Sequence, residues 1–289
     1  MKKIINNLSL VAVAVSLLCV TVGMIGCGGG DYEAEKLYWK ANKMYVQLLK
    51  DPQNTKPQDY ENIVVAYQKI VFKFPRWAFA PRAQLTIGQL YAMQNDTVKA
   101  KTEYEKVLKH FPNDQNSCAG ALFAIGKIYE FENKWDKALE NYNKIVSDYP
   151  NTYAAFQVPL YIAQYYKTKG LEQKAQNAYK DAISRYSKVI EEHPNTFAAL
   201  TAQNFTVAAL IEQQKWDEVL ENLRKIADSY PGTPVAAESL NTMAGIYVNQ
   251  LNESEKGAEI LRELLEKFPQ IGARELIEEK IETLKSGHN

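Results

Sequence analysis

Apolar residues recur along most of the chain at helical spacing, and prolines interrupt the pattern at regular intervals. An aromatic residue or a histidine precedes each of these prolines, which lie 37, 38, 44, 37 and 38 residues apart: Pro75, Pro112, Pro150, Pro194, Pro231 and Pro269. Apolar positions three and four residues apart share one helix face, and proline ends a helix because it lacks the backbone donor. A fixed period of this length indicates an array of repeated helical units.

Small residues recur at fixed places within each unit. In the third unit, Gly126, Ala138 and Pro150 follow one another at intervals of twelve residues. The same intervals join Gly88, Ala100 and Pro112 in the second unit, and Gly245, Gly257 and Pro269 in the sixth; the fifth has Ala208, Val219 and Pro231. A small residue lets a second helix approach the first closely, and the residue four positions on packs on the same face. The sequence therefore predicts two closely packed helices in each unit.

The ends of the array are predicted to differ from its middle. Helices are expected over 31–50 and 60–73, joined by a polar connector, 51–57, whose two prolines cannot continue a helix. Thr152, Thr196 and Thr233 follow proline turns and suit helix N-caps. After Pro269, residues 271–284 combine an apolar face, which includes Leu276, with a charged one. This pattern predicts a helix that caps the end of the array.

The fourth unit contains seven additional residues, between Gln176 and Tyr186. Seven residues make about two helical turns, so the apolar face stays in phase. Tyr179, Ala182, Tyr186 and Val189 continue that face. A longer helix that projects beyond its neighbours is expected, and two interpretations remain open: simple variation in length, or a ridge on which a partner docks.

These positions resemble the tetratricopeptide repeat, which has a small residue at its eighth position, tyrosine at the eleventh, alanine at the twentieth and proline at the thirty-second. Trp135 and Trp216 occupy the aromatic position before the second helix. The resemblance covers residues 34–269 in six units, with a period above the usual 34 residues. It implies an all-α, right-handed superhelical solenoid of about six helix pairs, with residues 270–289 as capping helix and tail. The long turns after proline are similar to those of envelope repeat lipoproteins: the outer-membrane assembly lipoprotein of the BamD type and, less closely, the cell-division coordinator of the Tol–Pal system.

The first residues predict export. Lys2 and Lys3 precede an apolar run from Leu8 to Val22, which indicates a signal peptide over residues 1–26. The segment 24–27, Met-Ile-Gly-Cys, resembles the lipobox of bacterial lipoproteins, although methionine stands where leucine is usual. The resemblance implies cleavage before Cys27 and lipidation of that residue, with 27–33 as attachment site and flexible tether. The alternative is an uncleaved transmembrane helix over residues 8–25, at the lower length limit.

Residue 28 is glycine and not aspartate, so the inner-membrane retention signal of such lipoproteins is absent. We therefore expect a lipid-anchored protein of the bacterial cell envelope, on the periplasmic face of the outer membrane if the bacterium is Gram-negative.

Composition argues against several other classes of function. Lys plus Arg and Asp plus Glu both number 34, so the chain lacks the basic excess expected for nucleic-acid binding. The three cysteines, Cys19, Cys27 and Cys118, form no CxxC pair and predict neither a zinc site nor a disulfide framework. No nucleotide-binding, metalloprotease or hydrolase motif occurs. We expect no cofactor and no metal; an enzyme built on the repeat scaffold remains the alternative from another class.

A binding surface is the remaining expectation. In repeats of this family, residues just after the small position of the first helix tend to face the concave surface. The candidates are Gln89, Ala92, Met93, Lys127, Glu130, Phe131, Gln164, Lys167, Thr168, Ala209, Glu212 and Gln213. They lack the Lys/Asn set with which chaperone-binding relatives clamp a terminal carboxylate, and each alone could be ordinary solvated surface.

The resemblance implies binding of protein or peptide segments. We expect an envelope scaffold or adaptor active in outer-membrane protein assembly. The alternative is a cell-wall or division coordinator, or an adaptor of an export machine.

Overall fold

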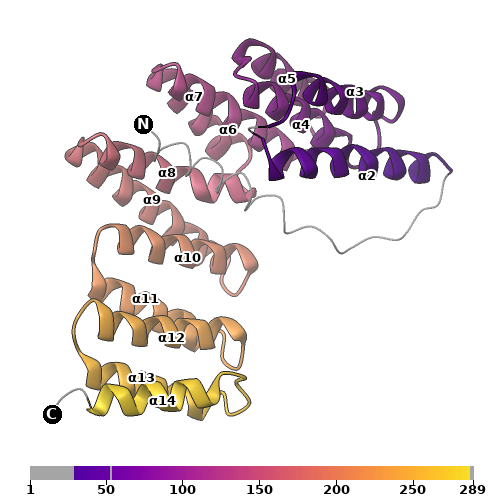
Figure 1. Ribbon diagram of the computed structural model, residues 1–289. Helices are drawn as coiled ribbons and strands as arrows, with labels where there is room; N and C mark the ends of the chain where they lie inside the picture. The colour runs from indigo at the N-terminus through magenta and orange to yellow at the C-terminus, as the bar shows by residue number, and fades with distance from the viewer. Residues whose placement is uncertain (1–28, 53, 287–289) are drawn as a thin grey trace. The chain divides into compact units, whose positions relative to one another are not determined.

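The computed structural model describes residues 29–286, with the exception of residue 53. Within these residues every regular element is an α-helix, which confirms the predicted all-α class (Figure 1). The helices are α2 (Gly29–Lys50), α3 (Pro57–Lys73), α4 (Ala80–Met93), α5 (Thr97–His110), α6 (Gln115–Phe131), α7 (Trp135–Asp148), α8 (Tyr153–Thr168), α9 (Glu172–Glu192), α10 (Phe197–Glu212), α11 (Trp216–Ser229), α12 (Pro234–Asn249), α13 (Ser254–Lys267) and α14 (Arg274–Ser286). The predicted signal peptide, 1–26, and Cys27 lie outside the described residues.

The first two helices begin earlier than predicted. Helix α2 starts at Gly29 and not at Asp31, so it takes in most of the range 27–33 that the sequence predicts as a tether. Helix α3 starts at Pro57 and not at Tyr60. Proline suits the first position of a helix because its missing donor would have no partner there. The backbone N–H of Lys56 donates to the Asp59 carboxylate at 3.2 Å and completes this helix start.

The described residues form two compact units, which divide between Leu90 and Tyr91. In the first unit, α2 packs against α3. An ion pair between Glu33 and Lys73, 3.6 Å apart, joins the start of α2 to the end of α3, so the two helices run antiparallel. Rings from both helices and from the segment that precedes α4 form a cluster with edge-to-face and tilted contacts: Tyr38, Tyr45, Tyr67, Trp77 and Phe79.

In the second compact unit, successive helices pack as pairs: α6 with α7, α8 with α9, α10 with α11, and α12 with α13. The second helix of each pair ends just before its proline turn, as predicted. The three predicted threonine N-caps are confirmed, since the hydroxyls of Thr152, Thr196 and Thr233 accept from backbone N–H groups three residues on. The turn inside each of these four pairs holds one residue with positive φ, Asn133, Gly170, Gln214 or Asn252, and so does the turn between α4 and α5, at Asn95.

The predicted position of the small residue in the first helix is wrong by one residue in the fifth and sixth repeat units. Gly88, Gly126 and Ala163 each lie five residues before the end of their helix. The equivalent residues of α10 and α12 are Val207 and Ala244, which are buried. The residues that the sequence favoured there, Ala208 and Gly245, are half-buried. In the sixth unit the turn before α13 has four residues where the other turns have three, which displaces the count.

Helix α9 confirms the predicted insertion, because it has 21 residues where α5, α7, α11 and α13 have 14. Its apolar face is buried at Tyr179, Ala182 and Tyr186. The hydroxyl of Tyr186 donates to the carbonyl of Phe156 in α8 at 2.6 Å, and Ala202 of α10 joins the same core cluster. Helices α8 and α10 therefore cover this face.

Helix α14 covers the C-terminal end of the second compact unit. It begins at Arg274, and its inner face buries Ile277 and Ile281 in the core shared by α10 to α13. Leu276, which the sequence placed on the apolar face, is 69% exposed. The outer face otherwise carries charged residues, and Arg274 pairs with Glu278 at 2.9 Å. These contacts agree with the predicted capping role.

Two paired helices approach each other very closely at Gly126 of α6. A Cβ atom at this position would lie 2.9 Å from Cδ1 and Cζ of Tyr142 on α7. Side-chain carbons do not pack at that distance, so either the ring or the helix would have to move. The absence of a side chain at Gly126 therefore makes room for the Tyr142 ring.

We expect Gly126→Ala to lower the free energy of unfolding by about 1–3 kcal/mol because it overpacks this contact. The matched control is Gly245→Ala in α12, where a Cβ atom would meet nothing nearer than the Asn249 amide nitrogen at 4.0 Å. That control should leave stability unchanged or raise it by up to about 1 kcal/mol, since alanine favours helix over glycine. Chemical denaturation of both variants measures the difference, and equal stabilities would contradict this account of Gly126.

Candidate functional site

The first helices of three successive units come together in the second compact unit. Helix α8 contacts both α6 and α10. Two of the predicted surface residues near the end of α6, Lys127 and Glu130, reach α8, and Lys167 near the end of α8 reaches α10. We call the surface formed by the C-terminal parts of α6, α8 and α10 the helix-end surface.

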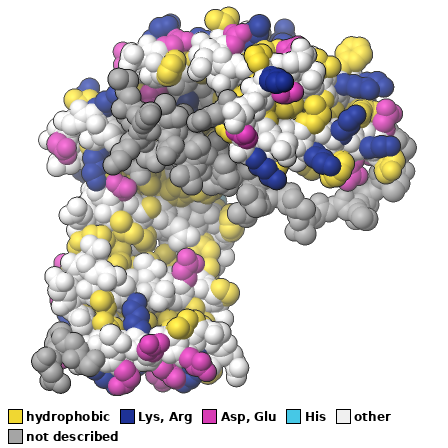
Figure 2. Space-filling view, viewed as in Figure 1, with side chains coloured by type: hydrophobic (Ala, Val, Ile, Leu, Met, Phe, Trp, Pro, Cys, Tyr) yellow, Lys and Arg dark blue, Asp and Glu magenta, His cyan; other side chains and the backbone are white. Residues whose placement is uncertain are grey.

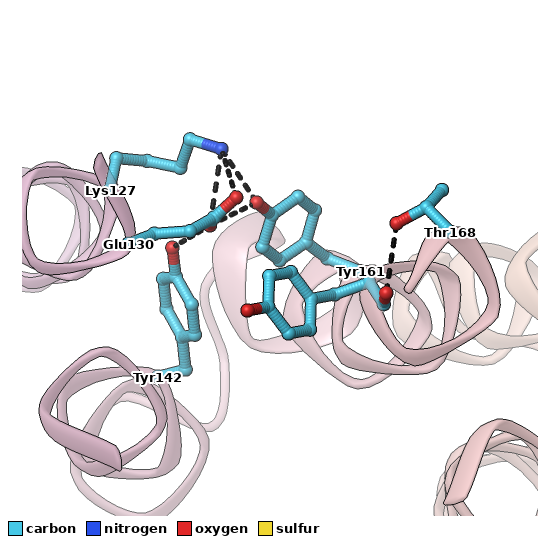
Figure 3. Close-up of polar contacts among 6 residues, drawn as sticks. Lys127, Glu130, Tyr142, Tyr161 and Thr168 are labelled. Atoms are coloured by element: carbon cyan, nitrogen blue, oxygen red, sulfur yellow. Dashed lines mark hydrogen bonds and ion pairs between the residues drawn. The ribbon is translucent and has the colours of Figure 1, made fainter. Parts of the chain in front are cut away.

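A polar network joins α6, α7 and α8 at this surface (Figure 3). The Lys127 ammonium lies 3.2 Å from the Glu130 carboxylate and donates to the Tyr161 hydroxyl at 2.6 Å. The hydroxyl of Tyr142 donates to Glu130 at 3.1 Å, and that of Tyr161 also donates to the same carboxylate oxygen. One carboxylate thus holds one cation and two phenols from three helices.

Both tyrosines of the network stay protonated over the physiological pH range. Burial raises the pKa of Tyr142 and of Tyr161 above the ordinary value, and the nearby Glu130 carboxylate raises both further by repelling a phenolate. The two phenols therefore remain donors to Glu130. Such charge-assisted hydrogen bonds are stronger than those between neutral groups, so the network fixes how α6, α7 and α8 meet.

A second link joins α8 to α10. The Lys167 ammonium lies 3.2 Å from a carboxylate oxygen of Glu212 and also donates to the Glu212 backbone carbonyl. A cation at the last carbonyl groups of a helix is favourable, because these groups lack partners within the helix. Lys167 and Glu212 are both partly exposed, so a bound partner could compete for either group.

Tyr179 differs from its counterpart in the preceding unit. Tyr142 and Tyr179 each lie four residues after the small residue of the second helix, Ala138 or Ala175. Tyr142 donates to Glu130, but the position equivalent to Glu130 in the fourth unit is Lys167. The Tyr179 hydroxyl is buried without a hydrogen-bond partner among the described residues, and its burial raises its pKa to about 12.

Half-exposed aromatic rings continue the surface beside the network. The Trp135 ring stacks on Tyr165 with centroids 3.4 Å apart, and its indole N–H donates to the Tyr166 hydroxyl at 3.2 Å. Lys169 and Lys174 lie over the rings of these two tyrosines. Phe131, at the end of α6, is 72% exposed. Flat rings with cations around them suit contact with another protein, since interfaces are enriched in aromatic residues.

The other predicted residues have more separate places. Gln89 is exposed in the first compact unit, where its side-chain oxygen accepts from the Tyr45 hydroxyl at 3.4 Å. Met93 and Gln164 are half-buried. The side chain of Thr168 turns back to a carbonyl of its own helix, as Figure 3 shows. Gln213 is the C-cap residue of α10, and its amide donates to the carbonyl of Ala209.

One surface prediction is wrong. Ala209 is fully buried in a core cluster with Ala163 and Ala175, because the register of α10 differs by one residue from the predicted one. Tyr161, Tyr165 and Tyr166 were not predicted to contribute to this surface. Three tyrosines within six residues of α8 exceed what the repeat needs for packing, and this excess is the signal that could have indicated a surface function.

The described residues offer little for other chemistry. In that part of the chain, no group of three or more His, Cys, Asp or Glu side chains is placed to hold a metal ion. Cys118 is buried, its thiol donates to the Phe111 carbonyl at 3.3 Å, and burial raises its pKa. A thiol in such surroundings is a poor nucleophile.

A comparison with family models agrees with the repeat architecture. A family model described as "Tetratricopeptide repeat-like domain" matches residues 6–201. Among solved structures, a tetratricopeptide repeat protein from Parabacteroides merdae is 16% identical, with a TM-score of 0.38, and the match covers 89% of this chain and 100% of that one. A thermophilic TPR protein from Thermus thermophilus is 17% identical, with a TM-score of 0.41 and coverage of 71% and 98%.

The yeast Sti1 TPR2AB domain, solved in a complex titled pHSP90, is 14% identical, with a TM-score of 0.33 and coverage of 89% and 100%. No curated protein matches the chain.

We expect Glu130→Gln to lower the free energy of unfolding by about 1–3 kcal/mol, because Lys127 and two phenols lose the carboxylate that they share. The control is Glu140→Gln on α7, which breaks an exposed ion pair with Lys144. Glu140→Gln should lower the free energy of unfolding by about 0.5 kcal/mol or less. Urea denaturation followed by circular dichroism compares the two variants, and similar losses would show that the network adds nothing to stability.

Proposed function

Because the chain belongs to the tetratricopeptide repeat-like domain family, we propose that it is a lipid-anchored scaffold of the bacterial cell envelope that binds protein or peptide segments. The helix-end surface is the proposed binding site. The partners are proposed to belong to the machinery that assembles outer-membrane proteins. The fold of this family typically serves as a non-catalytic scaffold for protein interaction.

The observation that supports binding most strongly is the exposure of Phe131 at the end of α6, where 72% of the residue is open to solvent. An exposed phenylalanine costs solubility, and a partner that covers it gains the free energy of removing that ring from water. The neighbouring network holds Lys127 and Glu130 in fixed positions. A partner can therefore bind without ordering these side chains first, which lowers the entropic cost of association.

The proposed lipid anchor rests on the amino-acid sequence alone. The basic start, the apolar run and the four residues that end at Cys27 support it. None of the helices in the described residues has both the length and the apolar character needed to cross a bilayer. The proposed outer-membrane location depends on the glycine at residue 28.

We expect Cys27→Ser to abolish lipid attachment in a bacterium that processes lipoproteins. The variant should keep its N-terminal segment and migrate as the longer precursor, because cleavage follows lipidation of the cysteine. Mass spectrometry of the N-terminal peptide and membrane fractionation measure both effects. Cys118→Ser serves as the control. Unchanged processing and membrane association of the Cys27→Ser chain would refute the lipid anchor.

We expect Phe131→Ser to reduce recovery of the natural partner about tenfold, which corresponds to about 1.4 kcal/mol and is ordinary for an aromatic anchor. Affinity purification from detergent extracts followed by quantitative mass spectrometry gives the measurement. Phe197→Ser is the control, since Phe197 is 83% exposed and lies at the opposite end of its helix, α10. Equal recovery by both variants would exclude Phe131 from the interface.

The partners recovered in the same experiment separate the two envelope roles. Outer-membrane barrel-assembly proteins would support the proposed one. Peptidoglycan synthases or division proteins would instead favour the coordinator role.

A further inference from the structure

The exposed face of α2 carries large apolar side chains at regular spacing. Tyr32, Trp39 and Val46 lie seven residues apart along the helix and are 72%, 64% and 43% exposed. Seven residues are close to two helical turns, so the three side chains form one stripe. An array end in water normally presents a polar outer face, and α14 at the C-terminal end largely does so. The stripe on α2 departs from that rule.

Lysines alternate with these apolar residues along the same stripe. Lys36, Lys43 and Lys50 each follow an apolar member by four residues, and all three are exposed. The Lys43 ammonium lies over the Trp39 ring at 5.4 Å from its centroid. A lysine beside an apolar stripe can lay its hydrocarbon stem along that surface and hold its charge at the edge.

Helix α3 repeats the pattern. Val65 and Phe72 lie seven residues apart and are 53% and 87% exposed. Lys69, Lys73 and Arg76 are exposed next to them. Figure 2 shows hydrophobic and basic side chains together over the part of the molecule where α2 and α3 lie.

The charge of this region differs from that of the rest of the chain. Residues 31–90 contain nine Lys and Arg and six Asp and Glu, whereas residues 91–289 contain 23 and 28. Three of the six acidic residues, Asp31, Glu33 and Glu35, lie in the first two turns of α2, and Glu33 is paired with Lys73. The rest of the α2 stripe is therefore a basic and aromatic surface.

We propose that the exposed face of α2 binds the interfacial layer of a lipid bilayer that contains anionic headgroups. Tryptophan and tyrosine favour the level of the headgroups, and lysines are attracted to an anionic membrane surface. A helix with this division of residues lies in the plane of the interface.

The proposal rests in part on the proposed lipid anchor. Helix α2 begins at Gly29, two residues after Cys27. A lipid on Cys27 would therefore bring the first turn of α2 to the membrane surface, and the stripe would let the rest of the helix lie along it. The anchor alone allows the helix to stand away from the bilayer, so the two proposals can be separated.

The test measures the depth of Trp39 in a membrane. The full chain is purified in detergent from a lipoprotein-processing host and reconstituted into vesicles of phosphatidylglycerol or phosphatidylcholine, each brominated high on the acyl chain. Bromine quenches tryptophan fluorescence at close range. We expect quenching of the wild-type chain that is stronger with phosphatidylglycerol and is lost in Trp39→Phe. Trp216→Phe is the matched control and should keep the quenching, since Trp216 is half-buried in another unit.

The basic residues are tested separately. Replacement of Lys36, Lys43 and Lys50 by glutamine should remove the preference for phosphatidylglycerol. The same replacement at three exposed lysines of the second compact unit, Lys109, Lys144 and Lys225, should preserve the preference for phosphatidylglycerol.

Mass spectrometry of the same samples reports the lipid on Cys27. If the lipid is present but Trp39→Phe and wild type are quenched equally, the membrane face is refuted and the anchor stands. If the lipid is absent but Trp39 is quenched, the anchor fails and the membrane face stands. Protection of Trp39 from both bromine and aqueous acrylamide, with a doubled mass in detergent, would assign the stripe to self-association and overturn the proposal.

Discussion

The pairing of helices in this chain depends on how closely the second helix of a unit can lie on the first. Gly126, on the first helix of its pair, has no side chain, and the ring of Tyr142 occupies the space that a side chain would fill there. Gly257 in α13 makes the reverse contact, because a Cβ atom there would lie 3.2 Å from the carbonyl oxygen of Ala244 in α12. The approach also decides what the ring can reach: Tyr142 passes α6 closely enough for its hydroxyl to meet Glu130. Packing and the polar network thus share one geometric cause.

Much of the fold could be predicted because its signals are local. Proline removes a backbone donor, and threonine at the start of a helix supplies an acceptor, whatever lies elsewhere in the chain. The extra length of α9 followed from counting residues between prolines. The contact positions in α10 and α12 were harder to predict from the sequence. In α10, Val207 stands where a small residue was assumed, and after α12 the turn before α13 is one residue longer than the others. A count along the sequence cannot detect such compensating changes.

The candidate surface was predictable only in part. Lys127 and Glu130 were found because their position relative to Gly126 is fixed within one helix. Their partner Tyr161 lies 31 residues beyond Glu130, and only the packing of α6 against α8 brings it near. The stacked pair Trp135 and Tyr165 has the same origin. Contacts between units depend on how successive pairs stack, and a repeat pattern does not specify the side chains that meet there.

The length of α9 has a consequence for how this chain can vary. Each helical residue advances the direction of the side chain by about 100°, so an insertion of one, two, five or six residues would turn Tyr186 well away from Phe156, and one of three or four would turn it by roughly 40–60°. Seven residues return the apolar face almost to its starting direction and lengthen the helix by about 10 Å. Natural homologues and engineered hybrids that differ in this helix should therefore differ by whole pairs of turns. The second helices of 14 and 21 residues that this chain contains differ by one such step of two turns.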